Sequence, residues 1–165
     1  MKPSATDLGL FIQETPLCDT HEHMPREEAY LEEKPDILRH LFQNYLMYDF
    51  WSSGLSRRNY KVLVDDSNPD IRGRFEAVEE TWKAIQHTGY AEAVRLTAKI
   101  LFGIDEITPD ALEGAAGSNA DYLQPGQRLH ILRDIANLDH IQTDDNRWPC
   151  PPDESGPDFF LYDMT

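Results

Sequence analysis

The feature that most constrains this chain is the wide separation of its strand-like segments. Leu17 to His23 has the pattern of a strand that enters the loop "MPREE", and "LDHIQTDD" has the pattern of a second strand. More than a hundred residues of mostly helical pattern lie between them. Because a sheet of two strands is only marginally stable, we expect an α/β chain that is mostly helical by length and whose sheet is completed by strands that this sequence does not contain.

Apolar residues in the intervening part recur at intervals of three and four, which is the period of an amphipathic helix. The sequence predicts one helix that Asp36 caps and that "SSG" at residues 52–54 ends. A stripe of large apolar residues predicts a second helix, and Gly89 and Gly103 bound a third. The members of the stripe are Phe75, Val78, Trp82 and Ile85.

Three further segments complete the expected organisation. Thr108 followed by Pro109 is typical of the start of a short helix. The segment "GQRLHILRDIAN" predicts another helix, which ends near Asn137. The last residues, "FFLYDMT", indicate a strand or an aromatic turn.

The charge and the cysteine content exclude several classes of protein. A formal net charge of −15 and a pI near 4.6 leave no surplus of Lys and Arg for nucleic-acid phosphates or an anionic membrane surface. No stretch approaches the length of a membrane span, and the N-terminus has no apolar core of signal-peptide length. Cys18 and Cys150 form no CxxC motif, so neither a disulfide framework nor a cysteine zinc site is implied. We expect a cytoplasmic protein.

The motif with the clearest chemistry is "PLCDTHEHMP", in which one residue separates two histidines. On a strand, residues i and i+2 project from the same face, so His21 and His23 would lie side by side with Asp19 on that face. Two imidazoles suit zinc or another borderline divalent metal, and a nearby carboxylate can orient an imidazole. The alternative is that both histidines are solvated or hydrogen-bonded polar residues at a strand end.

The surroundings of this motif resemble a known family. The string "CDTHEHMP", near the N-terminus after a short apolar strand, is similar to the first-strand metal motif of the amidohydrolase superfamily. The segments "YLMYDFWSSGL" and "WKAIQHTGYAEAVRLTAKILFGIDEIT" resemble the helical insertion after the first strand in the amidohydrolase-related, uronate isomerase-like branch. The resemblance covers most of the chain, and the two histidines are its most specific element.

The resemblance implies a metal-dependent (β/α)8 TIM barrel in which His21 and His23 bind a divalent metal, with zinc as the expected ion. Asp19 is the expected partner that orients a histidine. The implied activity is hydrolysis of a small polar carbonyl compound through a metal-activated water, since a divalent ion lowers the pKa of bound water to roughly 7. In the uronate isomerase branch, the same constellation instead supports proton transfer between C1 and C2 of a sugar acid.

The chain is shorter than such a barrel, which takes about 250 residues. We therefore expect an N-terminal fragment that forms a single partial domain. It would hold the first barrel strand in residues 1–25, the large helical insertion in 26–137, and the second strand with its following loop in 138–165. The catalytic residues and the other metal ligands are expected downstream of residue 165, so the fragment alone is expected to be inactive.

Four further residues are candidates for substrate contact. Asp144, Asp145 and Arg147 follow the second strand, where barrel enzymes build their active sites, although "TDDN" is equally typical of a turn. Trp51 lies in the helical insertion, which often contacts substrate in the resembled family. Other polar residues are expected to have structural roles, as ion pairs with local Asp and Glu or as lone histidines: Arg57, Arg58, Arg74, His40, His87, His130 and His140.

Two other interpretations compete with the enzyme. One is a non-catalytic, acidic helical binding module that recognises a partner through the aromatic residues of "DFWSSGL" and "DFFLYD". The other is a gene product without a function of its own. The enzyme interpretation predicts a small-molecule substrate and no nucleic-acid or membrane partner. It is compatible with a homo-oligomer.

Overall fold

The computed structural model describes residues 6–144 and 152–162. The chain divides into two compact units. The sheet unit comprises Met1–Lys34 and Asp121–Thr165, and the helical unit comprises Pro35–Ala120. The segment expected as the helical insertion, residues 26–137, contains this helical unit and also α2, α11 and η2 of the sheet unit, whose bounds follow.

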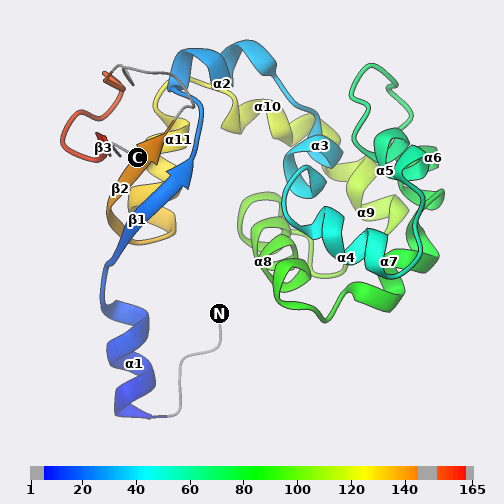
Figure 1. The fold of residues 1–165 in the computed structure, drawn as a ribbon, viewed down its shortest axis with the longest axis horizontal. Coiled ribbons are helices and arrows are strands. Elements are labelled where there is room, and N and C mark those ends of the chain that lie inside the picture. Colours follow the sequence, from blue (N-terminus) through cyan, green and yellow to red (C-terminus); the bar gives the residue numbers. More distant parts are fainter. Residues whose placement is uncertain (1–5, 145–151, 163–165) are drawn as a thin grey trace. The chain divides into compact units, whose positions relative to one another are not determined.

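In its described residues the sheet unit contains three strands and several short helices (Figure 1). In chain order its elements are α1 (Asp7–Glu14), β1 (Leu17–His23), α2 (Glu27–Glu33), α11 (Gln127–Leu129), the wider turn η2 (His130–Ile135), β2 (Leu138–Asp144) and β3 (Phe160–Tyr162).

The helical unit consists of short helices around one apolar core. Its elements are α3 (Ile37–Phe42), α4 (Leu46–Ser52), α5 (Arg57–Leu63), α6 (Ile71–Glu76), α7 (Glu79–Ile85), α8 (Gly89–Phe102), α9 (Pro109–Ala115) and the 3-10 turn η1 (Ala116–Ser118), and α10 (Asn119–Tyr122) follows at its boundary. Among the helices in the described residues, none is long and apolar enough to cross a bilayer.

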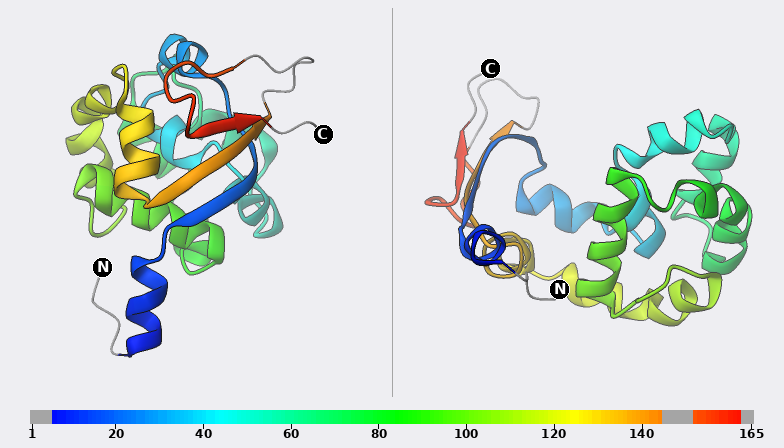
Figure 2. Two further views of the ribbon diagram at one scale, coloured as in Figure 1. Left: turned by 90° about the vertical axis from the view of Figure 1, so that its left-hand side faces the viewer. Right: turned by 90° about the horizontal axis from the view of Figure 1, so that it is seen from below.

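The three strands are parallel and lie in the order β1-β2-β3, as both views of the sheet show (Figures 1 and 2). The pairing of β1 with β2 extends from Leu17 opposite Leu138 to His23 opposite Asp144. β1 has the predicted bounds, and β2 begins where "LDHIQTDD" begins and extends to Asp144, the last described residue of that segment. The chain is thus α/β and mostly helical, with a small parallel sheet.

One face of this sheet is covered by the helix that leads into β2. The buried Ile141 packs with Phe159 and Phe160, and Leu129 and Leu132 from α11 and η2 pack against them. Because a parallel strand pair needs a crossover connection, α11 and η2 complete a strand–helix–strand unit into which the helical unit is inserted.

The segment before β1 is a helix and not the short apolar strand that the sequence suggested. The Thr6 hydroxyl accepts a hydrogen bond from the backbone N–H of Gly9 at 3.1 Å and so caps α1. None of the residues of α1 is buried, and Leu8, Phe11 and Ile12 are exposed.

The region predicted as one helix after Asp36 is broken into α3 and α4. Asp36 caps α3 as expected, by accepting from the N–H of Arg39 at 2.9 Å. The break lies at Asn44, whose side chain donates to the carbonyl of Leu41 at 2.8 Å and accepts from the N–H of Leu46 at 2.9 Å. Asparagine thereby replaces the backbone hydrogen bonds that would continue the helix.

The apolar positions predicted for the next helices form the core of the helical unit. All four stripe residues are buried, although they divide between α6, α7 and the turn that joins them. Gly103 ends α8 in the left-handed conformation, and Thr108 caps α9 through the N–H of Ala111.

A buried arginine joins the start of α3 to the centre of this unit. The Arg74 side chain is fully buried and forms an ion pair with Asp36. Its guanidinium also donates to the carbonyls of Leu63 and Asn68, both at 2.8 Å. Arg74 therefore has the structural role that the sequence predicts for it.

We expect Arg74→Met to destabilise the fold by about 3 kcal/mol or more, because it leaves Asp36 and several carbonyls without their cationic donor. The matched control is Arg72→Met on the same helix, since Arg72 makes exposed pairs with Asp110 and Glu113. Urea unfolding of both variants measures the difference. Equal midpoints for Arg74→Met and Arg72→Met would contradict this assignment.

His40 should make the helical unit sensitive to acid. Burial lowers the pKa of His40 from 6.5, although its hydrogen bond to Asn119 partly offsets this. His40 is therefore protonated more readily in the unfolded chain than in the folded chain. The free energy of unfolding should fall as the pH drops below about 6.5. Thermal unfolding of the wild type should show this loss, and His40→Gln should reduce it. The exposed His87 supplies the control, His87→Gln, which should retain the wild-type dependence.

Candidate metal centre at the carboxyl ends of the strands

The two histidines of the motif lie close together near the carboxyl end of β1. The ring centroids of His21 and His23 are 4.8 Å apart, in an edge-to-face arrangement. Both residues are exposed, and 47% of the His23 side chain is accessible. β1 thus presents two accessible imidazoles side by side, as the spacing predicted.

A shift in the register of the β1–β2 ladder places these residues. Asp19 pairs with Ile141, but Glu22 pairs with Thr143, so β1 contains one more residue than β2 over this stretch. The extra residue forms a bulge, and the Asp19 carboxylate accepts a hydrogen bond from the backbone N–H of His21 there, at 3.2 Å.

Asp19 therefore contacts the backbone of His21. The sequence placed it on the same face as the two imidazoles, but the bulge changes the alternation of faces after Asp19. Because directly paired residues share a face, Asp19 shares one with the buried Ile141, whereas His23 shares one with Asp144. Alternation alone could not reveal this, since a bulge is a property of the paired strands.

Asp144 is the substrate candidate that the structure brings to the histidines. It ends β2 directly opposite His23, and its Oδ2 lies 3.8 Å from the Nδ1 of His23. Asp145 and Arg147, the other candidates of this loop, lie outside the described residues.

The donor atoms present suit a divalent ion. Two imidazoles and a carboxylate are ligands that zinc and related ions accept. His21 and His23 would supply the nitrogen ligands, and Asp144 lies close enough to His23 to orient that imidazole.

A buried arginine anchors the loop that follows the histidines. The Arg128 guanidinium donates to the carbonyl of Pro25 at 2.8 Å and forms an ion pair with Asp153. It also lies 4.1 Å from the centroid of the Phe160 ring, within cation–π range. Arg128 thus links the chain after β1 to α11 and to the start of β3.

The ionisation of Asp153 supports this anchor. Burial would raise the pKa of Asp153, but hydrogen bonds from Ser155 and the charge of Arg128 outweigh that effect, and the pKa lies below its usual value. The pair is therefore charged at neutral pH, with both side chains almost fully buried.

A second group of donor atoms lies toward the amino end of the same strands. Cys18, Asp139 and His140 each offer one ligand atom, and the three atoms lie within 4.8 Å of one another. In the part of the chain that the structure describes, this is the group of three that could hold an ion. No sequence motif predicts it, because Cys18 lies next to Asp139 and His140 only through the register of β1 and β2.

Trp51, the remaining substrate candidate, belongs to the helical unit. Its ring packs edge-to-face with those of Tyr48 and Tyr60, and the Arg57 guanidinium lies 4.7 Å from its centroid. These contacts give Trp51 a packing role beside the core.

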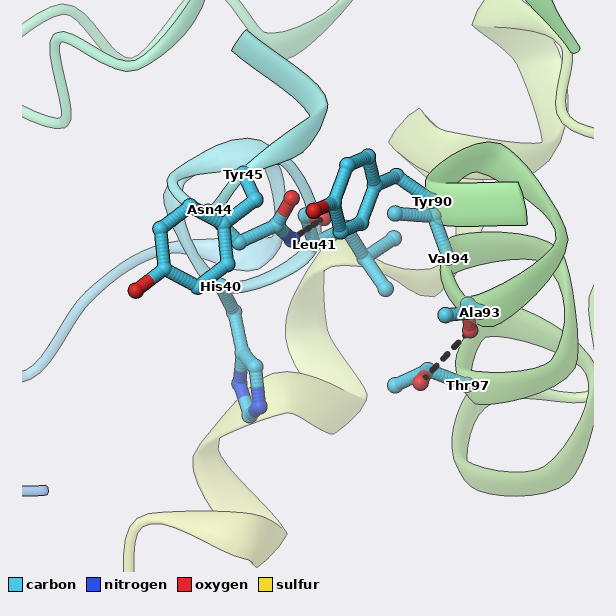
Figure 3. Close-up of a pocket in the computed structure, with 8 residues that line it drawn as sticks. All are labelled: His40, Leu41, Asn44, Tyr45, Tyr90, Ala93, Val94 and Thr97. Atoms are coloured by element: carbon cyan, nitrogen blue, oxygen red, sulfur yellow. Dashed lines mark hydrogen bonds between the residues drawn. The ribbon is translucent and has the colours of Figure 1, made fainter. Parts of the chain in front are cut away.

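The helical unit also has a small pocket of about 230 Å³ between α3, the turn that leads from α3 into α4, and α8 (Figure 3). The rings of Tyr45 and Tyr90 stand at its rim, with centroids 5.9 Å apart, and both side chains are about half exposed. The pocket therefore combines an apolar base with accessible aromatic rings, and its lining residues are His40, Leu41, Asn44, Tyr45, Tyr90, Ala93, Val94 and Thr97.

Comparison with known proteins assigns no relative to this chain. It matches no protein-family model, no curated protein and no solved structure.

We expect Arg128→Met to loosen the loop that leads into β3. The change leaves Asp153 buried without its cation, which costs about 3 kcal/mol or more in comparable sites. Amide hydrogen exchange should therefore accelerate by roughly a hundredfold at residues 153–160. Arg133→Met is the control, because Arg133 makes an exposed pair with Asp134. Unchanged exchange in Arg128→Met would show that the pair does not anchor the loop.

Proposed function

We propose that the chain supplies the first strands of a metal-dependent hydrolase of the amidohydrolase type, which acts on a small polar carbonyl compound. The observation that carries the proposal is the placement of His21 and His23 together near the carboxyl end of β1, with Asp144 opposite His23 on β2. The resemblance of "CDTHEHMP" to the first-strand motif of that superfamily agrees with it.

The architecture of the sheet unit is compatible with the start of a (β/α)8 barrel. Such a barrel begins with parallel strands that are neighbours in chain order and are joined by helices. β1, β2 and β3 follow that order, and α11 with η2 covers one face of β2. The chain leaves β1 at its carboxyl end toward α2, which is the end where barrel enzymes carry their active-site insertions (Figure 1).

The chemistry follows from the residues at that end. His21 and His23 would hold the ion, for which zinc is the expected choice, and a bound divalent ion lowers the pKa of water into the neutral range. The Asp19 carboxylate holds the backbone of His21 in place, because it accepts a hydrogen bond from the N–H of His21. Asp144 can orient the imidazole of His23 or accept a hydrogen bond from a substrate hydroxyl.

The substrate class is a small carbonyl compound, such as a carboxylic acid, a lactone or a sugar acid. Proton transfer in a sugar acid, as in uronate isomerases, uses the same donor set and is the closest variant of the proposal. The acidic composition and the absence of a CxxC motif from the sequence support a cytoplasmic protein with a small-molecule partner.

The test is zinc binding by isothermal titration in a Cys18→Ser background, which removes the thiol of the second donor group. His21→Ala and His23→Ala should each weaken zinc binding by more than roughly tenfold, because each removes a ligand. His87→Ala, which removes an exposed histidine of the helical unit, should bind as the background does. Unchanged affinity in both motif variants would overturn the proposal.

A second candidate function is a binding module, and the aromatic pocket favours it, although the rings there are not those of "DFWSSGL" and "DFFLYD" that the sequence pointed to. Tyr45 stacks on Tyr48 with an interplanar angle of 17° and also contacts Tyr90, so three accessible rings gather beside the pocket. Such surfaces are typical of recognition sites. This candidate predicts that a ligand of the pocket binds equally well after His21→Ala, and loses affinity after Tyr45→Ser.

A further inference from the structure

We propose that Cys18, Asp139 and His140 form a second divalent-metal site, which takes an ion that accepts a thiolate ligand, with zinc as its natural occupant. The site uses none of the residues assigned to the proposed hydrolase. Its evidence is the convergence of three ligand atoms of different chemistry within 4.8 Å.

The register of the two strands builds this site. Leu17 pairs with Leu138, but the next residue, Cys18, pairs with His140, so Asp139 is an extra residue on β2. A bulge of this kind turns the extra side chain away from strict alternation. Asp139 thereby lies beside Cys18 and His140, and two paired strands hold all three residues in place.

The distances between the ligand atoms lie on either side of those that a tetrahedral ion needs. The Cys18 Sγ lies 3.9 Å from the Oδ2 of Asp139, and the His140 Nδ1 lies 2.8 Å from the same oxygen. Zinc bonds of about 2.3 Å to sulfur and about 2.0–2.2 Å to nitrogen and oxygen separate neighbouring ligands by roughly 3.3–3.6 Å. Small rotations of the three side chains would therefore accommodate the ion.

The site is open enough to be loaded from solution. Cys18 is exposed, and the side chains of Asp139 and His140 are 63% and 25% accessible. Three protein ligands leave the fourth position to water, as in zinc sites that bind a substrate. A thiolate with an imidazole favours zinc over magnesium or calcium, which prefer oxygen ligands.

The position of the site gives it a consequence for the fold. Cys18 and Asp139 are 121 residues apart in sequence, and an ion bound by both would tie β1 to β2 across the whole insertion (Figure 2). Because the unfolded chain does not present these ligands together, binding should stabilise the folded chain. Zinc should therefore raise the midpoint of thermal unfolding.

Cobalt titration tests the proposal, because a cysteine ligand gives Co²⁺ a strong near-ultraviolet charge-transfer band that histidine and carboxylate ligands do not give. The wild-type chain should develop this band and saturate near one equivalent. Cys18→Ser should abolish it, and His140→Ala and Asp139→Asn should each weaken cobalt binding by more than roughly tenfold. No band in the wild type, or equal affinity in His140→Ala, would overturn the proposal.

Two controls separate this site from its alternatives. The double variant His21→Ala, His23→Ala should keep the band, so the hydrolase proposal can fail while this site stands. Cys150→Ser should also keep it, since Cys150, which lies outside the described residues, is not part of the group. A band that survives in Cys18→Ser but is lost in Cys150→Ser would contradict the assignment.

A second measurement covers the case in which Cys18→Ser fails to fold. In the wild type, zinc should slow alkylation of Cys18 by iodoacetamide at least tenfold, as read by mass spectrometry of the modified peptide. Magnesium at the same concentration should not protect the thiol. Equal alkylation rates with and without zinc would overturn the proposal.

Discussion

The parallel pairing of β1 with β2 is the interaction on which the rest of the sheet unit depends. It joins segments that the whole helical unit separates in sequence, and it sets every contact between them from Leu17 to Asp144. The entropy of closing a loop grows only with the logarithm of its length, so an inserted unit adds little to the cost of the pairing. The insertion also has a core and a buried ion pair of its own, and these stabilise it independently of the strands.

Two irregularities of the ladder then determine which side chains meet. The bulge at Asp139 gathers a thiol, a carboxylate and an imidazole toward the amino end of the strands. The extra residue of β1 after Asp19 restores the register in which Leu17 pairs with Leu138, so His23 pairs with Asp144 at the carboxyl end. A ladder without the first bulge would pair Cys18 with Asp139 instead of His140, so the group around Cys18 depends on that bulge. Bulges often occur next to functional sites for this reason.

Local features of this fold could be predicted from the sequence, and features that depend on pairing could not. The bounds of β1, the start of β2, the caps at Asp36 and Thr108 and the stop at Gly103 depend on a few neighbouring residues, and all agree with the structure. The break between α3 and α4 was missed because the side chain of Asn44 competes with the helix, which an apolar period does not reveal.

The candidate sites divide in the same way. The proximity of His21 and His23 follows from their spacing on one strand, and the structure agrees with that expectation. The face of Asp19 was mispredicted, and the group around Cys18 was not anticipated, because both depend on the register between distant strands. From the sequence alone His140 is expected to be a lone structural histidine, because Cys18 comes close to Asp139 and His140 only when β1 pairs with β2.

The most direct test of this account is zinc-edge X-ray absorption of the Cys18→Ser variant loaded with one equivalent of zinc. A metal centre at the carboxyl ends of the strands predicts nitrogen and oxygen neighbours at about 2.0–2.1 Å, with the outer-shell scattering that is characteristic of imidazole. That scattering should weaken when His21 and His23 are both replaced by alanine. Two results would contradict the assignment of the two histidines as metal ligands. One is an unchanged imidazole pattern after both histidines are replaced, and the other is a Cys18→Ser protein that binds no zinc although it keeps both histidines.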